Sequence, residues 1–220
     1  MKRLSQKVSC VVLSLALLCA CMPFAAATGS NSSTPQELPA YIINGENKTQ
    51  EEIDREIEAY IDSLMVSLNG AEDTNATPRV QTYYKSITLD TLEDQPVSGY
   101  PGNQREGGYC FETGGGFYYS EDGGPTASIS LSVSLPFGKS PFSFSVGIGL
   151  GNKSDTFGTY VKAPDKTNYW KLYVTKYLDV TPIAIYEVDS PQAEITDDSR
   201  FVYLTEIVVV DKIKLSAVRA

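Results

Sequence analysis

The 220-residue sequence contains no histidine. This absence excludes Ser-His-Asp and Cys-His nucleophilic systems, histidine proton shuttles and nearly all catalytic zinc sites. Cys110 has no imidazole to activate it, and no Ser-x-x-Lys pair occurs after residue 27. We expect Cys110 to be a small buried residue within a strand. Because no nucleophile, metal motif or cofactor motif is found, the protein is predicted not to be an enzyme and to need no cofactor.

Cysteine is scarce in the part of the chain that is expected to fold. Three of the four cysteines lie before residue 22, so in a chain cut after residue 27 Cys110 has no partner for an intrachain disulfide. Residues 1–27 have the form of a signal peptide, with three basic residues, an apolar run and three alanines before the predicted cleavage site. The segment 18–21 also resembles a bacterial lipoprotein box, which would anchor the chain through Cys21. We predict a secreted, extracellular protein, and a bacterial one, because exported animal proteins usually pair their cysteines.

Basic residues are fewer than acidic ones, 18 against 27, which gives a net charge of −9. Three of the basic residues lie in the predicted signal peptide, so the rest of the chain is more acidic still. Long-range repulsion makes nucleic acid and anionic membranes poor partners for the protein as a whole, although a local patch can differ. We predict no nucleic-acid partner. A glycan, a cell-surface protein, a membrane and a second copy of the chain stay open as partners.

One amphipathic helix is predicted over residues 49–70. Residues 28–48 precede it as a disordered tether, and residues 71–79 follow it as a polar linker. Thr49 and Glu52 form a capping box at its start, and Asn69-Gly70 supplies its stop. Its apolar stripe either packs on the β-domain or belongs to a pro-segment that masks an interaction surface until it is cleaved.

Beyond residue 80 the chain is rich in Val, Ile, Tyr and Thr, separated by Gly, Pro, Asp and Asn, and no helical period returns. The predicted fold is mainly β: an antiparallel β-sandwich or barrel-like domain over 80–220, preceded by one N-terminal amphipathic α-helix. Residues 208–210 are apolar on both faces, so the last strand is expected to be covered on both sides. The strands are expected near 80–89, 109–119, 128–135, 142–150, 156–162, 169–178, 183–188 and 201–215.

The most regular pattern lies between residues 126 and 151, where large apolar residues alternate with Ser or Gly. Period two places every large side chain on one face of a β-hairpin and leaves an uncharged face of small residues. In one interpretation the small face meets solvent, a second sheet or the 49–70 helix. In the other the hairpin inserts into a membrane, because each strand reaches the roughly 9 to 11 residues that a spanning strand needs. The predicted membrane or partner contacts are Ile129, Leu131, Val133, Leu135, Phe137, Phe142, Phe144, Val146, Ile148 and Leu150.

In pattern this hairpin resembles the insertion hairpins of β-pore-forming toxins such as the aerolysin-like group. The resemblance implies that several copies close one sheet across the membrane, with the small residues facing the lumen and Phe137 anchoring the tip. Our first functional prediction is an exported, non-enzymatic protein that acts by binding or assembly at a cell surface or in the extracellular space. A pore-forming or antimicrobial protein is the alternative.

Tyrosine is abundant, with 14 residues. An aromatic surface made by Tyr118, Tyr119, Trp170 and Tyr173 would suit a glycan, a peptide or a membrane interface, whereas cross-strand packing is the structural alternative. Alternation places Trp170 and Tyr173 on opposite faces of their strand. A second functional alternative is a small jelly-roll glycosidase, whose acids would come from residues 112, 187 and 206.

Overall fold

The computed structural model describes residues 35–70, 82–137 and 141–220. The predicted signal peptide, the whole of the 71–79 linker and the first part of the tether lie outside these residues. The described part is mainly β with one helix, as predicted. Among the described residues, no helix is long and apolar enough to cross a membrane.

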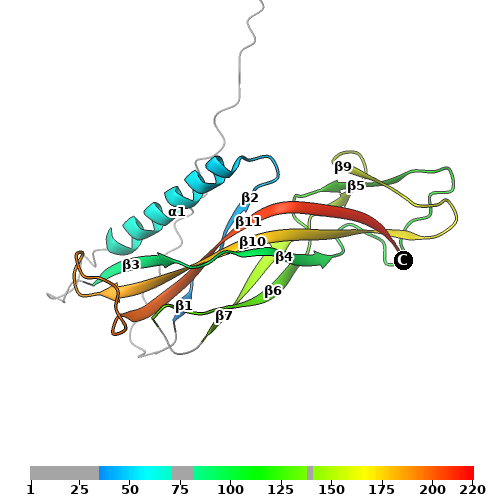
Figure 1. The fold of residues 1–220 in the computed structure, drawn as a ribbon. Coiled ribbons are helices and arrows are strands. Elements are labelled where there is room, and N and C mark those ends of the chain that lie inside the picture. Colours follow the sequence, from blue (N-terminus) through cyan, green and yellow to red (C-terminus); the bar gives the residue numbers. More distant parts are fainter. Residues whose placement is uncertain (1–34, 71–81, 138–140) are drawn as a thin grey trace, which may run out of the picture. The chain divides into compact units, whose positions relative to one another are not determined.

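Two long antiparallel strands form the centre of a six-stranded sheet (Figure 1). They are β10 (Trp170–Val188) and β11 (Arg200–Arg219). The strands expected at 169–178 and 183–188 are therefore one strand. The chain stays extended between them because β11 pairs with every residue of the junction, including Pro182, which lies opposite Glu206. β3 (Tyr83–Thr88) and β4 (Leu92–Gly99) pair with β10, one towards each end.

The tether prediction for residues 28–48 is wrong where the structure describes them. β1 (Gln36–Glu37) and β2 (Tyr41–Asn44) pair with β11 in parallel. The sheet is therefore mixed rather than antiparallel, and the helix does not precede the β-domain but follows two of its strands. These strands escaped prediction because β1 is two residues long and polar, and β2 holds only one fully buried side chain, Ile43.

The helix α1 (Gln50–Gly70) confirms the expected element and its capping box. The Glu52 carboxylate accepts hydrogen bonds from the Thr49 N–H at 2.8 Å and the Thr49 hydroxyl at 2.9 Å, and these bonds lower the pKa of Glu52. Ile53 is buried among Ile183 and Ile207 of the long strands. The helix thus covers one face of β10 and β11 by packing.

Two smaller sheets cover the opposite face of β10 and β11. β6 (Thr126–Val133) and β7 (Phe142–Gly149) form one of them, a hairpin whose apolar side chains join Leu178, Val180 and Val208 in one core. β5 (Gly116–Ser120), β8 (Asn152–Ser154) and β9 (Thr159–Lys162) form the other, which packs on Leu172 and Val174. Residues 208–210 are covered on both faces, as predicted, but the sheets remain open, so the barrel-like alternative is wrong.

Two further expectations about strands are corrected. Only Gly116–Ser120 of the 109–119 segment is a strand, because Gly114 and Gly115 adopt positive φ angles of 88° and 141° that interrupt extended chain. Cys110 therefore lies outside any strand and is half-buried, with its thiol donating to the Lys166 carbonyl at 3.4 Å. β4 was not predicted because it contains Pro96, which is tolerated there since β4 is an edge strand.

Candidate functional site

The β6–β7 hairpin is the candidate site, and it is longer than its regular ladder. Eight residue pairs run from Thr126 opposite Gly149 to Val133 opposite Phe142. Antiparallel bonding continues towards the base, where the Leu150 N–H donates to the Pro125 carbonyl at 2.9 Å and the Gly151 N–H donates to the Gly123 carbonyl at 3.1 Å. Each arm thus has about the length that a membrane-spanning strand requires.

The apolar face of the hairpin is buried against the long strands. Val146 is 1% exposed and Phe144 4% exposed, and both contact the core formed with Leu178 and Val208. The structure therefore brings the predicted contact residues together on one face, but that face is turned inwards. Those that are buried are Leu131, Val133, Phe144, Val146, Ile148 and Leu150, and those that are half-buried are Ile129, Leu135, Phe137 and Phe142.

The small face of the hairpin is turned to solvent. Ser128, Ser130 and Ser132 of β6 are exposed, as are Ser143 and Ser145 of β7. The hydroxyl oxygens of Ser132 and Ser143 lie 2.8 Å apart across the pair. The expectation that the helix or a second sheet covers this face is wrong, because α1 packs on the other side of the long strands. Packing against the described residues does not explain why these side chains are small.

Glycines form a tight junction at the base of the hairpin. Gly123, Gly124 and Gly151 have φ angles of 67°, 82° and 72°, a region that other residues rarely adopt. A Cβ atom on Gly124 would lie 1.8 Å from the Gly151 carbonyl oxygen. The Gly102 N–H donates to that same carbonyl at 2.9 Å. The two strands of the hairpin are therefore connected to the rest of the chain at one compact junction of glycines, which we call the glycine junction.

A poorly satisfied polar group is buried beside this base. Lys176 is 4% exposed, and its ammonium lies 3.8 Å from the Glu121 carboxylate, a long ion pair. Burial lowers the pKa of Lys176, against the opposing effect of Glu121. The Tyr119 hydroxyl, which packs on Gly151, has no hydrogen-bond partner among the described residues, and burial raises its pKa.

A second buried polar group lies beneath the hairpin itself. Glu206 is 1% exposed, and its Oε1 atom has no hydrogen-bond partner among residues 35–70, 82–137 and 141–220. Burial, together with the charge of Glu37 on β1, raises the pKa of Glu206 to about 7. Glu37 in turn accepts a bond of 3.4 Å from the Ser145 N–H on the outer edge of β7. Two carboxyl groups therefore meet where the hairpin rests on the sheet.

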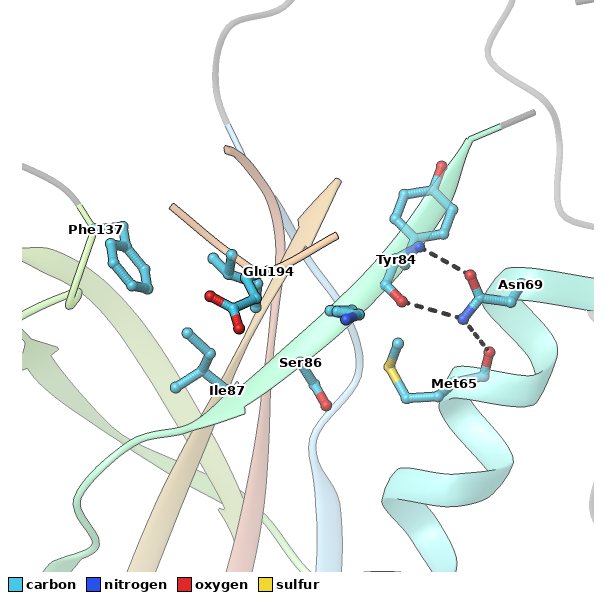
Figure 2. Close-up of a pocket in the computed structure, with 9 residues that line it drawn as sticks. Met65, Asn69, Tyr84, Ser86, Ile87, Phe137 and Glu194 are labelled. Carbon is cyan, nitrogen blue, oxygen red and sulfur yellow. Dashed lines mark hydrogen bonds between the residues drawn. The ribbon is translucent and has the colours of Figure 1, made fainter. Parts of the chain in front are cut away.

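The tip of the hairpin rests on aromatic side chains. The Phe137 ring lies 6.0 Å from that of Tyr186, and the Phe142 ring lies 5.4 Å from that of Phe201, both nearly perpendicular. Phe137 also forms one end of an open pocket of about 670 Å³, together with Ile87 and Glu194 (Figure 2).

At the other end of that pocket, Asn69 joins the end of α1 to β3 (Figure 2). Its side chain accepts from the Tyr84 N–H at 2.8 Å and donates to the Tyr84 carbonyl at 3.2 Å. The same amide donates to the Met65 carbonyl at 3.0 Å. The Asn69 side chain therefore hydrogen-bonds backbone groups of Tyr84 on the edge of β3 that no described strand pairs with.

The predicted aromatic surface is not one surface. Tyr119 is buried, and Trp170 is half-buried in the core under the three-stranded sheet, so both belong to packing. Tyr118 precedes Tyr119 in β5, so alternation places it on the other face of that strand, where its ring centre lies 5.3 Å from that of Tyr160. Only Tyr173 lies on an open face of the long strands, where its ring meets that of Tyr100 at 5.2 Å.

The acids of the glycosidase alternative have separate surroundings. Glu112 lies in a turn rather than a strand. Glu187 pairs with Arg200, and Glu206 is enclosed beneath the hairpin. Glu206 therefore does not line an open cleft in which a sugar could meet it.

Sequence reasoning missed the buried polar groups Lys176 and Glu206 as parts of the site, together with Glu121, the more exposed partner of Lys176. Lys176 and Glu206 each stand at an apolar position of an alternating strand, and this interruption is the signal that could have found them. Comparison of the chain with protein-family models, with curated proteins and with solved structures found no match.

Proposed function

We propose that this is an exported, non-enzymatic protein that acts on membranes by assembly. Several copies release the β6–β7 hairpin and insert it as part of a closed sheet that opens a pore. The observation that carries the proposal is the state of the hairpin: a separate two-stranded sheet with its apolar face buried and an uncharged face of small residues in water. This is a specific form of the binding or assembly predicted from the sequence.

The energetic argument concerns the apolar face. Burying a Val, Leu, Ile or Phe side chain stabilises a protein by about 1.5–3 kcal/mol, so exposing this face to water is prohibitive. Moving it into hydrocarbon is different, because Phe144 and Val146 exchange one apolar environment for another. The small face carries no charge that would have to cross the bilayer. Insertion is therefore opposed far less than exposure to water.

The backbone argument concerns the edges of the hairpin. Among the described residues, β6 and β7 pair only with each other, so neither has a strand partner on its outer edge, where the Ser145 N–H of β7 donates to the Glu37 side chain instead. Unpaired backbone groups are not tolerated in hydrocarbon, and only closure of a sheet removes its edges. A single hairpin cannot close. Copies of the chain that pair edge to edge would satisfy these groups, which is why the proposal requires assembly.

The polar groups around the hairpin favour its release. An unsatisfied buried polar group costs about 1–3 kcal/mol, and the resting position of the hairpin buries Glu206 without a partner for one of its oxygens. Within the part of the chain that the structure describes, Lys176 at the base forms one long ion pair, with Glu121. Departure of the hairpin would let water reach these groups. The resting state therefore includes costs that the inserted state does not.

Dye release from vesicles tests the proposal with a matched pair of neighbouring residues. Ile129 lies in the middle of β6 on the apolar face and is half-buried, whereas Ser130 lies on the exposed face. Ile129→Lys places a charge in the hydrocarbon, which costs about 2–4 kcal/mol per subunit near the bilayer mid-plane. Ser130→Lys places the same charge in the lumen. We expect Ile129→Lys to lower leakage about tenfold or more and Ser130→Lys to retain it.

A labelling experiment keeps the test valid if Ile129→Lys folds poorly. In a Cys110→Ser background, an environment-sensitive dye on Ile129→Cys should be quenched by nitroxide lipids, and the same dye on Ser130→Cys should not. Equal quenching at both positions contradicts the proposal. So does a folded wild-type protein that neither leaks vesicles nor forms oligomers in any lipid mixture, a result that leaves binding without insertion.

A further inference from the structure

An open face of the long strands carries tyrosine and lysine side chains together. The helix α1 lies over only one end of β10 and β11 (Figure 1). Beyond that end, alternation places one set of their side chains on the side away from the three-stranded sheet. We call this set, with its neighbour on the chain after β4, the Tyr/Lys face. It consists of Tyr100, Lys171, Tyr173, Tyr177, Lys212 and Lys214.

The charge of this face is opposite to that of the chain. The whole protein carries a net charge of −9, yet three lysines share this face of the two paired strands. Lys212 and Lys214 lie on β11 opposite Tyr177 and Thr175, and Lys171 lies further along β10, opposite Val218. None of the three forms a salt bridge within the described part of the chain. Asp211 directly precedes Lys212 on β11 but forms no salt bridge among the described residues, and Asp179 accepts the Asp94 N–H at 2.9 Å. The lysine charges are therefore available to an anionic partner.

The tyrosine rings of this face are arranged for an interface rather than for stacking on a sugar. The Lys171 ammonium lies 5.3 Å from the ring centre of Tyr100, and that of Lys212 lies 5.9 Å from the ring centre of Tyr177. Tyr100 and Tyr173 meet edge to face. An ammonium group thus covers one ring face where a flat glycan ring would stack. Tyrosine and lysine side by side are typical of protein surfaces at the headgroup level of a bilayer.

We propose that the Tyr/Lys face docks the protein on a bilayer that carries anionic phosphate headgroups. This inference rests on the proposed membrane activity and names its first contact. The face also lies near the base of the hairpin. Tyr100 is two residues from Gly102, whose N–H binds Gly151 at the base of the hairpin. Docking through this face holds the edge of the sheet next to the glycine junction near the bilayer, while the hairpin still lies on the opposite face of β10 and β11.

Co-sedimentation with vesicles of phosphatidylcholine and phosphatidylglycerol tests the docking face. Each lysine near an anionic surface contributes about fivefold in affinity, so Lys212→Gln with Lys214→Gln should weaken binding about 25-fold. The matched control is Lys162→Gln with Lys166→Gln, which removes the same charge from exposed positions elsewhere and should leave binding within about twofold. Added salt should weaken the binding of the wild type.

The possible results separate this inference from the proposed function. Equal binding by both double variants, or equal binding of the wild type to pure phosphatidylcholine, overturns the docking face while leakage can still stand. Preference of the wild type for a polysaccharide over these vesicles, lost in the Lys212/Lys214 variant, overturns the bilayer as the partner. Lysine-dependent sedimentation without leakage in any mixture supports docking and contradicts pore formation. Ile129→Lys should retain sedimentation while losing leakage.

Discussion

The carboxyl group of Glu206 should make the stability of this protein depend on pH near neutrality. Its side chain is 1% exposed beneath the hairpin, and burial with the neighbouring Glu37 raises its pKa from 4.5 to about 7. Glu206→Gln keeps the shape of the side chain and removes its titration. We expect this substitution to stabilise the protein at alkaline pH and to have little effect in acid.

The direction in which stability changes with pH follows from proton binding by Glu206. Between the unfolded value of 4.5 and the folded value of about 7, the folded protein holds a proton on Glu206 that the unfolded chain has released. Stability therefore falls as pH rises through this interval, and it levels off above it. The interval between the two pKa values corresponds to roughly 3 kcal/mol, which is the largest gain expected for Glu206→Gln at about pH 8.

Urea unfolding of the wild type and of Glu206→Gln between about pH 4 and pH 8 measures this effect. Other carboxyl groups titrate in both proteins, so the difference between the two stability profiles isolates Glu206. Glu58→Gln removes an exposed carboxyl group from α1 and serves as the control, with a flat difference expected. A flat difference for Glu206→Gln as well would refute the reasoning, because it would mean that Glu206 is hydrated in the folded protein.

Two other substitutions test the packing around the site. Lys176→Met should stabilise the protein by about 1 kcal/mol in urea unfolding at neutral pH, because it removes a buried, weakly paired ammonium while the partly exposed Glu121 stays hydrated; a loss of stability would show that the ion pair is favourable. Thr49→Ala should lower the stability by about 1 kcal/mol through loss of the helix cap, and Thr49→Ser should restore it. A thermal melt in which Thr49→Ala matches the wild type would contradict this role of the cap.

The local elements were predictable where one residue pattern decides them. Thr49 and Glu52 mark the start of α1 because a capping box satisfies backbone donors that no tertiary contact needs to supply. The hairpin was predictable for a similar reason, since period two defines both its strands and its two faces. The weak strands β1, β2 and β8 were not, because their pairing with distant chain, rather than their own composition, makes them strands.

The candidate site was predictable only in part. Alternation identified the residues that share the apolar face, from Ile129 to Leu150. The prediction of an aromatic surface was wrong, because the side chains of Tyr119 and Trp170 pack in the core. The Tyr/Lys face joins Tyr100, which follows β4, to residues of β10 and β11, and Tyr100 and Lys214 lie more than 100 positions apart. No local pattern brings such residues together, because the pairing of strands sets their neighbours.

The sequence by itself determined that histidine chemistry is absent, that one helix is amphipathic, and that the 126–151 segment has a large and a small face. Only the tertiary structure decided what each face meets. It placed the apolar face of the hairpin on the long strands, its small face in water, and the carboxyl of Glu206 between hairpin and sheet. The physical reason is that periodicity fixes which side chains share a face, whereas the contact opposite that face depends on chain distant in the sequence.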